Sequence, residues 1–479
     1  MRRDFCEKRL SSGRRAVAIG ALTLLVGLPG RVVSAEGADG DLRQEIELLK
    51  ERVRELEEAL HRNGQVEAAA TEVAPSEQAS VLDEVPLQER VDAIADEVDR
   101  LGYAQREGAS VLDGLDGISV SGAVTTFVQG VGGGRSDAFG EGKGTDASFS
   151  GDLAVEVPLG TYGGAYARAL VGQGRGVAGA LPPVFSGPNA DLERHDDGAS
   201  IVELWYQTEL PFPTVIDKRV AITVGKMDPR RFFDANDVAN NQRQQFMADT
   251  FVNNLAVDWG GDENGYGLGA RLGYRFTSIY NQNLKVEAQV GVFEVGGDPL
   301  QSFGGPFVIG EIDVSRRAYG LQRKYRLYAW TNLADHLDYE NISTNRQKEN
   351  WGVGMSLDHQ LSGDLTLFGR YGFQDPAVNR FDHVVTLGAR IVGNRWSRGG
   401  DILGLATGFA RASRSYGKVS YDLDGVEVSG GETFFEAYYS YFLERHLRLS
   451  PDIQYIHRPG GIGEADDYFV FALRTQIDF

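Results

Sequence analysis

The sequence predicts an all-β protein, an antiparallel transmembrane β-barrel of about 16 strands with an N-terminal α-helical coiled-coil stalk. Three observations predict this fold class. The chain begins with an export signal, and no later apolar run is long enough for a membrane helix. From Ile118 to the last residue, apolar and polar residues alternate with a period of two. The expected segments are a signal peptide over residues 1–35, a periplasmic stalk and linker over 36–117, and a barrel over 118–479.

The first 35 residues have the layout of a secretory signal peptide. A basic stretch, MRRDFCEKRLSSGRR, precedes the apolar run AVAIGALTLLVGLPG, and the small residues of VVSA follow as a cleavage site. The apolar run is too short to cross a membrane as a helix. We therefore expect the mature chain to begin near Glu36. Cys6 is the single cysteine and lies in the removed part, so no disulfide or thiol chemistry is expected.

The charge of the chain argues against one class of partner. The formal net charge is −20, and removal of the basic signal would leave the mature chain more acidic still. No nucleic-acid partner is therefore expected. An enzyme is not expected either, because the chain has neither a His-Glu-x-x-His pair nor a Gly-x-Ser-x-Gly turn. No cofactor and no metal site are predicted.

The predicted stalk carries two apolar seams with heptad spacing. The first seam, within residues 41–62, consists of Leu42, Ile46, Leu49, Val53, Leu56 and Leu60. The second seam consists of Leu87, Val91, Ile94, Val98 and Leu101. A single amphipathic helix that packs on its own domain is the alternative. Because helices this short are marginal alone in water, we expect the stalks to associate, as a homotrimer, although the seams do not fix the oligomer number.

The barrel segment is predicted from strict alternation along many short stretches. In YGLGARLGYRF (Tyr266–Phe276), large apolar residues occupy one face, and glycines with two arginines occupy the other. LKVEAQVGV, WGVGMSLDHQL, LTLFGRYGF and the final FVFALRTQIDF repeat the pattern. A soluble sheet produces the same alternation. The charges that recur on the polar face favour a water-filled lumen, where their solvation costs little.

The length of this region sets the size of the barrel. About 360 residues follow the stalk, which is enough for about 16 to 18 membrane strands with their turns and loops. A barrel of that size encloses an aqueous channel rather than a filled core. The expected function is therefore a pore.

Several stretches resemble one family of such pores. VGKMDPRRFFDANDVANNQRQQFMADTFVNN (Val224–Asn254) is similar to the signature segment of the OprB-type carbohydrate-selective porins. LFGRYG (Leu367–Gly372), RGGDILGLATGFARAS (Arg398–Ser413) and ETFFEAYYSYFLERHLRLSPDIQYIHRPGG (Glu432–Gly461) match as well. The resemblance covers residues 118–479 and implies a 16-stranded barrel in a bacterial outer membrane. It also implies passive diffusion of small polar solutes, with carbohydrates foremost.

Candidate site residues come from one loop and from the inward rows. The polar segment Asp228–Asn254 follows a strand, so we expect it to fold into the pore as a constriction; a loop that only shields the outer rim is the alternative. Its candidate contacts are Arg230, Arg231, Asp234, Asn236 and Asn240, because amide and guanidinium groups suit sugar hydroxyls. Lys226, just before this segment, is also expected at the constriction. By strand alternation, a set of charged residues is expected to point into the lumen. These residues are Arg168, Glu203, Arg271, Arg275, Glu287, Arg326, Arg370, Glu436, Asp452 and Arg474.

Mixed charge signs in the lumen favour a neutral polar solute, whereas a ring of arginines would favour anions. The charges would alternatively pair across the lumen and brace the barrel. Two other functions therefore remain open: an anion-selective, phosphate-type porin, and a structural barrel that tethers the envelope through its stalk. Phe479 ends the lipid-facing row, and the family resemblance implies that the insertion machinery reads a terminal aromatic. The expected partners are small polar solutes, outer-membrane lipid and that machinery.

Overall fold

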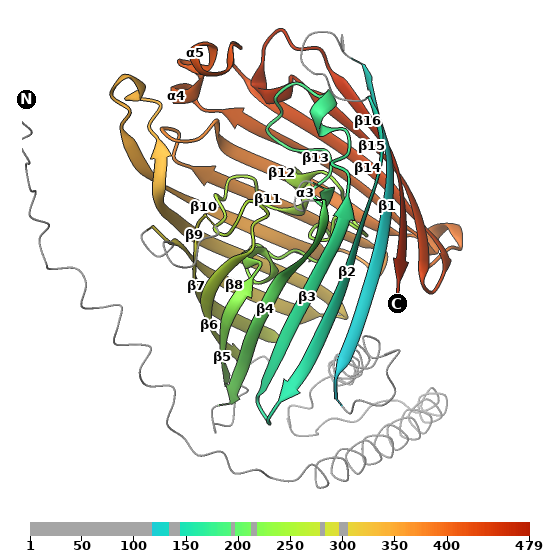
Figure 1. Ribbon diagram of the computed structural model, residues 1–479. Coiled ribbons are helices and arrows are strands. Elements are labelled where there is room, and N and C mark those ends of the chain that lie inside the picture. Colours follow the sequence, from blue (N-terminus) through green and yellow to red (C-terminus); the bar gives the residue numbers. More distant parts are fainter. Residues whose placement is uncertain (1–116, 134–143, 193–196, 212–217, 278–282, 297–304) are drawn as a thin grey trace, which may run out of the picture. The chain divides into compact units, whose positions relative to one another are not determined.

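In a computed structural model of the protein, 16 antiparallel strands close into one barrel (Figure 1). The structure describes residues 117–133, 144–192, 197–211, 218–277, 283–296 and 305–479. The expected signal peptide and nearly all of the expected stalk and linker lie outside the described residues. The predicted barrel of about 16 strands is confirmed.

Each strand pairs with its neighbours in the chain. The strands are β1 Ser119–Gly133, β2 Thr145–Leu159, β3 Gly163–Gln173, β4 Gly198–Pro211, β5 Lys218–Met227, β6 Gly267–Thr277, β7 Leu284–Phe293, β8 Phe307–Ala318, β9 Leu321–Leu337, β10 Gln347–Gln360, β11 Leu365–Gln374, β12 Phe381–Val392, β13 Ile402–Ala412, β14 Gly431–Glu444, β15 Leu447–His457 and β16 Tyr468–Asp478. The barrel closes where β1 pairs with β16, in a register that runs from Ala123 opposite Asp478 to Gly133 opposite Tyr468. Closure leaves no unpaired strand edge, which a membrane would not tolerate.

The strands alternate as their sequences predict. In β6, Leu268 and Leu272 are exposed on the outer face, whereas Arg271 between them is buried inside. In β16, Phe471 and Leu473 are 50% and 43% exposed. This outer apolar row faces the membrane in a barrel of this kind. Within the described part of the chain, no helix is long and apolar enough to cross a membrane.

The two ends of the barrel differ in the length of their connections. At one end, only Tyr319 and Gly320 join β8 to β9, and the chain ends after β16 on the same side. At the other end, residues 228–266 join β5 to β6, and residues 413–430 join β13 to β14. Transmembrane barrels keep short turns in the periplasm and long loops outside, so the long-loop end is the extracellular end.

The described parts of the connections contain short helical pieces. The α-helices are α3 Asp249–Val252, α4 Arg414–Gly417 and α5 Ser420–Asp424. The 3-10 turns are η2 Ala178–Ala180, η4 Pro229–Arg231, η6 Ile342–Thr344, η7 Gly393–Trp396 and η8 Pro459–Gly461.

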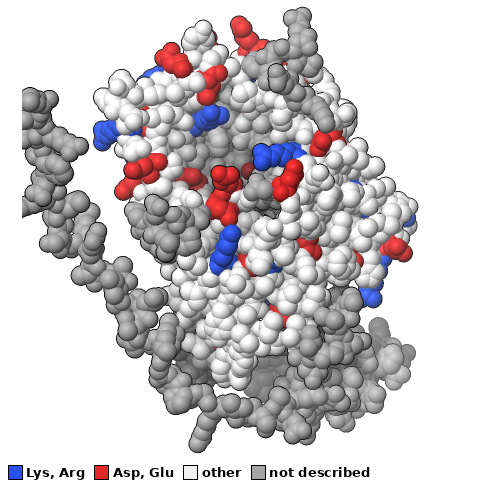
Figure 2. Space-filling model, viewed as in Figure 1, with Lys and Arg blue, Asp and Glu red and all other residues white. Residues whose placement is uncertain are grey.

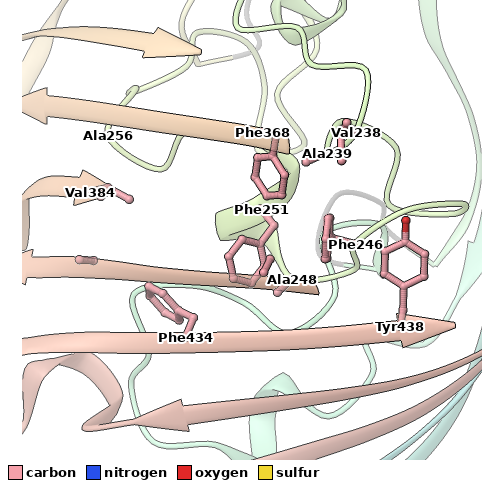
Figure 3. Close-up of a cluster of buried hydrophobic side chains, with 12 residues drawn as sticks. Val238, Ala239, Phe246, Ala248, Phe251, Ala256, Phe368, Val384, Phe434 and Tyr438 are labelled. Atoms are coloured by element: carbon pink, nitrogen blue, oxygen red, sulfur yellow. The ribbon is translucent and has the colours of Figure 1, made fainter. Parts of the chain in front are cut away.

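The connection from β5 to β6 folds back into the barrel and packs on its inner wall. One apolar cluster joins loop and wall, and Figure 3 shows its rings gathered between the loop and the strands; we call it the first loop cluster. Its members are Val238, Ala239, Phe246, Ala248, Phe251 and Ala256 from the loop, with Phe368, Val384, Ala406, Ala410, Phe434 and Tyr438 from β11 to β14. Phe246 lies at its centre, with its ring centroid 5.4 Å from that of Phe368 and 4.9 Å from that of Tyr438.

A second loop cluster forms beside the first. It consists of Met227, Phe233 and Val257 with Phe293, Phe307, Ile309, Tyr328 and Trp330 of β7 to β9. Wall glycines make room for the rings: a Cβ on Gly404 would collide with the Tyr438 ring, and one on Gly388 with the Phe368 ring. Where the loop covers the inner wall from β7 to β14, aromatic rings therefore lie among buried polar side chains such as Glu311, Ser356 and Arg370. The expected water-filled lumen does not extend to this part of the wall, because loop side chains cover it.

Candidate functional site

The internal loop begins at η4, which a local ion pair holds in place. The Asp228 carboxylate accepts the Arg230 backbone N–H at 2.9 Å and the Arg230 Nε at 2.6 Å. The Arg230 Nη2 atom also donates to the carbonyls of Asn264 and Gly265, at 3.0 and 3.3 Å. Burial alone would lower the pKa of Arg230, but the Asp228 carboxylate outweighs burial and raises it. Arg230 therefore stays charged and ties together the two ends of the connection.

Asp234 is the main attachment point of the loop to the wall. It has a left-handed backbone conformation, with a φ of 55°. Its carboxylate accepts from Arg370 Nε at 3.1 Å, from the Tyr328 hydroxyl at 2.9 Å and from the Asn254 N–H at 2.8 Å. Its own N–H donates to Glu311 at 2.8 Å. Because Asp234 and Arg370 are 2% and 3% exposed, this pair holds the loop on β9 and β11 and does not line an open lumen.

Three more of the predicted site residues hold the loop backbone. Asn236 donates to the Ser356 hydroxyl and to a β10 carbonyl, both at 3.2 Å. The Glu436 carboxylate accepts two loop N–H groups at 2.5 and 3.0 Å. Arg474 donates to two loop carbonyls at 2.7 and 2.8 Å. Asp452, near Glu436 on β15, is buried as well. These inward residues lie beneath the loop, so the expectation that water would solvate them was wrong.

Arg326, Arg271, Arg275 and Glu287 form ion pairs along the wall itself. Arg326 contacts the carboxylates of Asp313 and Asp358 at 3.1 and 2.9 Å. Glu287 accepts from Arg271 at 2.5 Å and from Arg275 at 2.9 Å. The Arg275 side chain is 42% exposed, whereas that of Arg326 is 3% exposed. These charges therefore pair between neighbouring strands along the wall, and not across the lumen as one of the two expectations had it.

Lys226 does not face the lumen. Its cross-strand neighbours are Leu204 and Leu268, which are 59% and 37% exposed on the outer face. Its ammonium group instead contacts Asp262 at 3.0 Å. The placement of Lys226 at the constriction was therefore wrong. Lys226 lies two residues after Val224 and so belongs to the same outer row of β5. Only the loop that begins two residues later turns inward.

A cavity of about 1240 Å³ remains between the loop and the opposite wall. Its lining comes from the beginning of β1, from β2 to β4, from the loop and from the end of β16. Five arginines, four carboxylates and six amide side chains contribute to it. The arginines and carboxylates are Arg168, Arg230, Arg231, Arg243, Arg445, Asp152, Glu203, Asp228 and Asp478. Figure 2 likewise shows acidic and basic side chains interspersed on the face in view.

Arg231 is the predicted loop residue that reaches furthest into this cavity. Its Nη2 atom contacts Glu203 and the Tyr166 hydroxyl, both at 2.8 Å. Its guanidinium also lies over the Tyr166 ring, 4.5 Å from the centroid, and its side chain is 35% exposed. Arg168 adds a second contact to Glu203 at 3.5 Å. Burial acts to lower the pKa of Arg231, but the charge and hydrogen bonds of Glu203 together with Tyr166 raise it overall, so Arg231 stays cationic.

Sequence reasoning missed a second charge cluster in the cavity. Arg243 contacts Asp191 at 2.9 Å and also contacts Asp152. Asp152 comes from β2, and Asp191 comes from residues 174–197, which join β3 to β4. The Nη2 atom of Arg243 has no partner among the described residues. Arg243 lies within the predicted constriction segment, but no local pattern brings three residues so distant in sequence together. Asn240 also lines the cavity, and its Oδ1 atom accepts from Arg370 at 3.4 Å.

Phe479 completes the barrel seam. Its backbone exchanges hydrogen bonds with Gly122 of β1, at 2.8 and 2.9 Å. Its ring is 54% exposed and covers Gly122, where a Cβ would collide with it. The last residue is therefore part of the closing strand pair and of the outer face.

The comparisons with known proteins agree with this architecture. Residues 141–479 match the model of the carbohydrate-selective porin, OprB family. Among solved structures, Pseudomonas putida OprB is similar with a TM-score of 0.61 and 19% identity, over 80% of this chain and 97% of that chain. A mutant of the Rh. blastica porin has a TM-score of 0.43 and 10% identity, over 76% of this chain and 100% of that chain.

A Vibrio cholerae protein, OmpT, has a TM-score of 0.43 and 9% identity, over 76% of this chain and 99% of that chain. No curated protein matches the sequence. The Pseudomonas putida OprB structure establishes likeness of fold, and the family match spans most of the barrel. Family and fold together indicate an outer-membrane channel rather than an enzyme, and the chain belongs to the OprB family of carbohydrate-selective porins.

Proposed function

We propose that the protein is a passive diffusion pore for small neutral polar solutes, with carbohydrates as the main class. The observation that carries this proposal is the balanced lining of the cavity, with five arginines, four carboxylates and six amides. Because opposite charges pair there, the net field is small and ion preference is weak. Amide and guanidinium groups offer fixed donors to hydroxyl groups, and carboxylates offer acceptors.

The proposed solute contacts are the residues that reach the cavity. Arg231 and Asn240 come from the loop, and Arg168 comes from the facing wall, where the buried Glu203 carboxylate holds both arginines. Arg243 borders the cavity as well, but its side chain is buried against Asp152 and Asp191, so it fixes the cavity lining and is not itself a proposed solute contact. Several weak contacts, rather than one strong one, suit a pore that must release its solute. In this proposal Asp234, Asn236, Arg370, Glu436, Asp452 and Arg474 act by positioning the loop.

An anion-selective porin is the second candidate. The observation that favours it is the single excess of arginines over carboxylates in the cavity lining. Phosphate would bind through the same guanidinium groups, because planar guanidinium and phosphate oxygens match in geometry. The two candidates differ in the solute that blocks the current.

Planar-bilayer recordings of the purified protein test the proposal. We expect weak ion selectivity and partial block of the current by glucose. Arg231→Ala should raise the glucose concentration needed for half-block about tenfold, because a charge-assisted hydrogen bond to the sugar is lost. Arg316→Ala, at the exposed short-turn end of β8, is the matched control and should leave the block unchanged. Strong anion preference, with block by phosphate and none by glucose, would favour the second candidate.

We also propose roles for the segments before the barrel, on the basis of sequence alone. Residues 1–35 would direct export, and residues 36–117 would form a periplasmic coiled coil that joins three copies. Chemical cross-linking of the full-length protein should give trimers, and Ile46→Asp combined with Val53→Asp should weaken them. A monomer at every concentration would refute the trimer. A trimer insensitive to both changes would assign the association to the barrel instead.

A further inference from the structure

A groove of about 710 Å³ opens at the extracellular rim, between the ends of β13 to β15 and the connection 413–430. We call it the rim groove. Its lining is Phe409, Arg411, Ala412, Ser413, Arg414, Gly417, Lys418, Val428, Ser429, Gly430, Gly431, Thr433, His457 and Arg458. This lining includes four Lys or Arg residues and no Asp or Glu, although the chain has 68 acidic and 48 basic residues. The rim groove is therefore a local reversal of the overall charge.

Most of this positive charge is free. Arg414 and Lys418 are exposed, and neither forms an ion pair with a carboxylate of the described residues. Arg411 is different, because Asp382 holds its guanidinium through two hydrogen bonds of 2.8 Å. The charge of Arg411 is therefore largely neutralised by Asp382, and this residue mainly shapes the groove. Arg414 and Lys418 keep charges that a ligand can neutralise.

Arg458 is held in place for the same groove. It has a left-handed backbone conformation, with a φ of 54°. Its guanidinium lies against Gly430, where a Cβ would be 2.9 Å from the guanidinium atoms. Its Nε is buried and has no partner among the described residues. The neighbouring His457 is fixed by Asp467 at 2.8 Å, so the side chains around Arg458 are ordered by contacts outside the groove.

The rim groove opens on the lipid-facing side of the barrel. Phe409, Thr433 and His457 are cross-strand neighbours on the outer rows of β13, β14 and β15. Phe409 is 40% exposed, and Phe435, two residues along the outer row from Thr433, is 47% exposed. Helices α4 and α5 lie at the opposite end of the barrel from the C-terminus (Figure 1). The cations therefore lie where the outer apolar belt gives way to the extracellular loops.

We propose that the rim groove binds the phosphate group of an anionic lipid of the surrounding outer leaflet. Guanidinium groups pair with phosphate oxygens through short, charge-assisted hydrogen bonds. Basic pockets at the edge of a membrane-spanning region are suited to phosphorylated headgroups. The continuity of the groove with the apolar belt favours a lipid over a free anion, because acyl chains can lie on Phe409 while the phosphate reaches Arg414, Lys418 and Arg458.

Native mass spectrometry of the detergent-solubilised full-length protein tests this site. The probes are lipid A with both phosphates, the same lipid without phosphates, and inorganic phosphate. We expect the phosphorylated lipid to bind at least about tenfold more tightly than the other two. Arg414→Ala combined with Lys418→Ala should lower that affinity about tenfold, and both side chains are exposed, so folding should not suffer.

The matched control is Arg316→Ala combined with Arg395→Ala, which removes the same charge from exposed positions at the short-turn rim. This control should bind the phosphorylated lipid as the wild type does. Arg458→Gln is a second groove variant. Its folded barrel is checked by the position of its band on a gel of unheated sample. Unchanged binding in both groove variants, or equal binding of the phosphate-free lipid, would overturn the proposal. Equal occupancy by inorganic phosphate would also overturn it, because the site would then take a free anion.

Discussion

The inner wall of the barrel has two regions that use the same residue types differently. From β7 to β14 the wall carries Phe368, Phe434 and Tyr438, and the internal loop covers it. Along β1 to β4 the wall carries Asp152, Arg168 and Glu203 and borders the cavity. We call these regions the covered wall and the cavity wall. Apolar clusters join the loop to the covered wall, whereas the ion pairs of Arg231 and Arg243 join it to the cavity wall.

An ion pair illustrates what this difference means. The side chains of Asp234 and Arg370 on the covered wall are 2% and 1% exposed, and together they fix the loop. On the cavity side, Arg231 is 35% exposed while its partner Glu203 is fully buried. Removing one member of a buried pair leaves the other charge desolvated, whereas a water-facing arginine can be lost cheaply. The same chemistry therefore anchors the loop in one region and borders the open cavity in the other.

The largest effect is expected from Arg370→Ala on the covered wall. The change leaves the Asp234 carboxylate buried without its cation, at a cost of about 3–5 kcal/mol. We expect the loop to detach, so that single-channel conductance rises and fluctuates, and the temperature at which the folded gel band is lost falls. An unchanged conductance and an unchanged band would contradict the anchoring role.

Substitutions of two neighbouring residues on β14 allow the inner and outer faces of the covered wall to be compared. Phe434 is 3% exposed within the first loop cluster, while Phe435 is 47% exposed on the outer face. Phe434→Ala should destabilise the protein by about 3 kcal/mol through a cavity beneath the loop. Phe435→Ala is the matched control and should cost clearly less, since its ring leaves a lipid-facing surface. Equal losses of thermal stability would show that the loop adds no packing at Phe434.

On the cavity wall, two substitutions should shift ion selectivity in opposite directions. Glu203→Gln removes a negative charge between Arg168 and Arg231, so the pore should favour anions by a few fold. Arg231→Ala removes a positive charge and should favour cations. Glu203 keeps its contact with Arg168, so the loss of stability should be smaller than that of Arg370→Ala. Zero-current potentials in a salt gradient measure both. Shifts of the same sign, or none, would mean that this pair does not line the conducting path.

The smallest effect on the folded barrel is expected at the seam beside the cavity wall. The Phe479 ring is half exposed and packs on Gly122, so Phe479→Ser should change the thermal stability of folded protein only slightly. We expect it to lower the amount of barrel inserted in cells, because a terminal aromatic can be recognised before the strands close. Normal insertion with a large loss of thermal stability would reverse this assignment.

Residues of the strands show how far the sequence alone could go. The apolar outer rows of β6 and β16, and the inward positions of Arg271 and Arg474, follow from alternation and were predicted correctly. Lys226 was misplaced because it was assigned with the loop, although it still belongs to the outer row of β5. No pattern in the sequence predicted the contacts of Arg243 with Asp152 and Asp191, because these residues come from three separate segments.

By itself, the sequence determined the barrel class, an approximate strand number and the face of most strand residues, because side-chain direction in a strand is a local property with a period of two. Only the tertiary structure decided which inward residues meet water. Arg168 borders the cavity, whereas Arg370 is sealed beneath the loop, yet both occupy inward positions on their strands. The difference depends on where residues 228–266 fold, and that is set by aromatic packing and buried hydrogen bonds between positions more than a hundred residues apart.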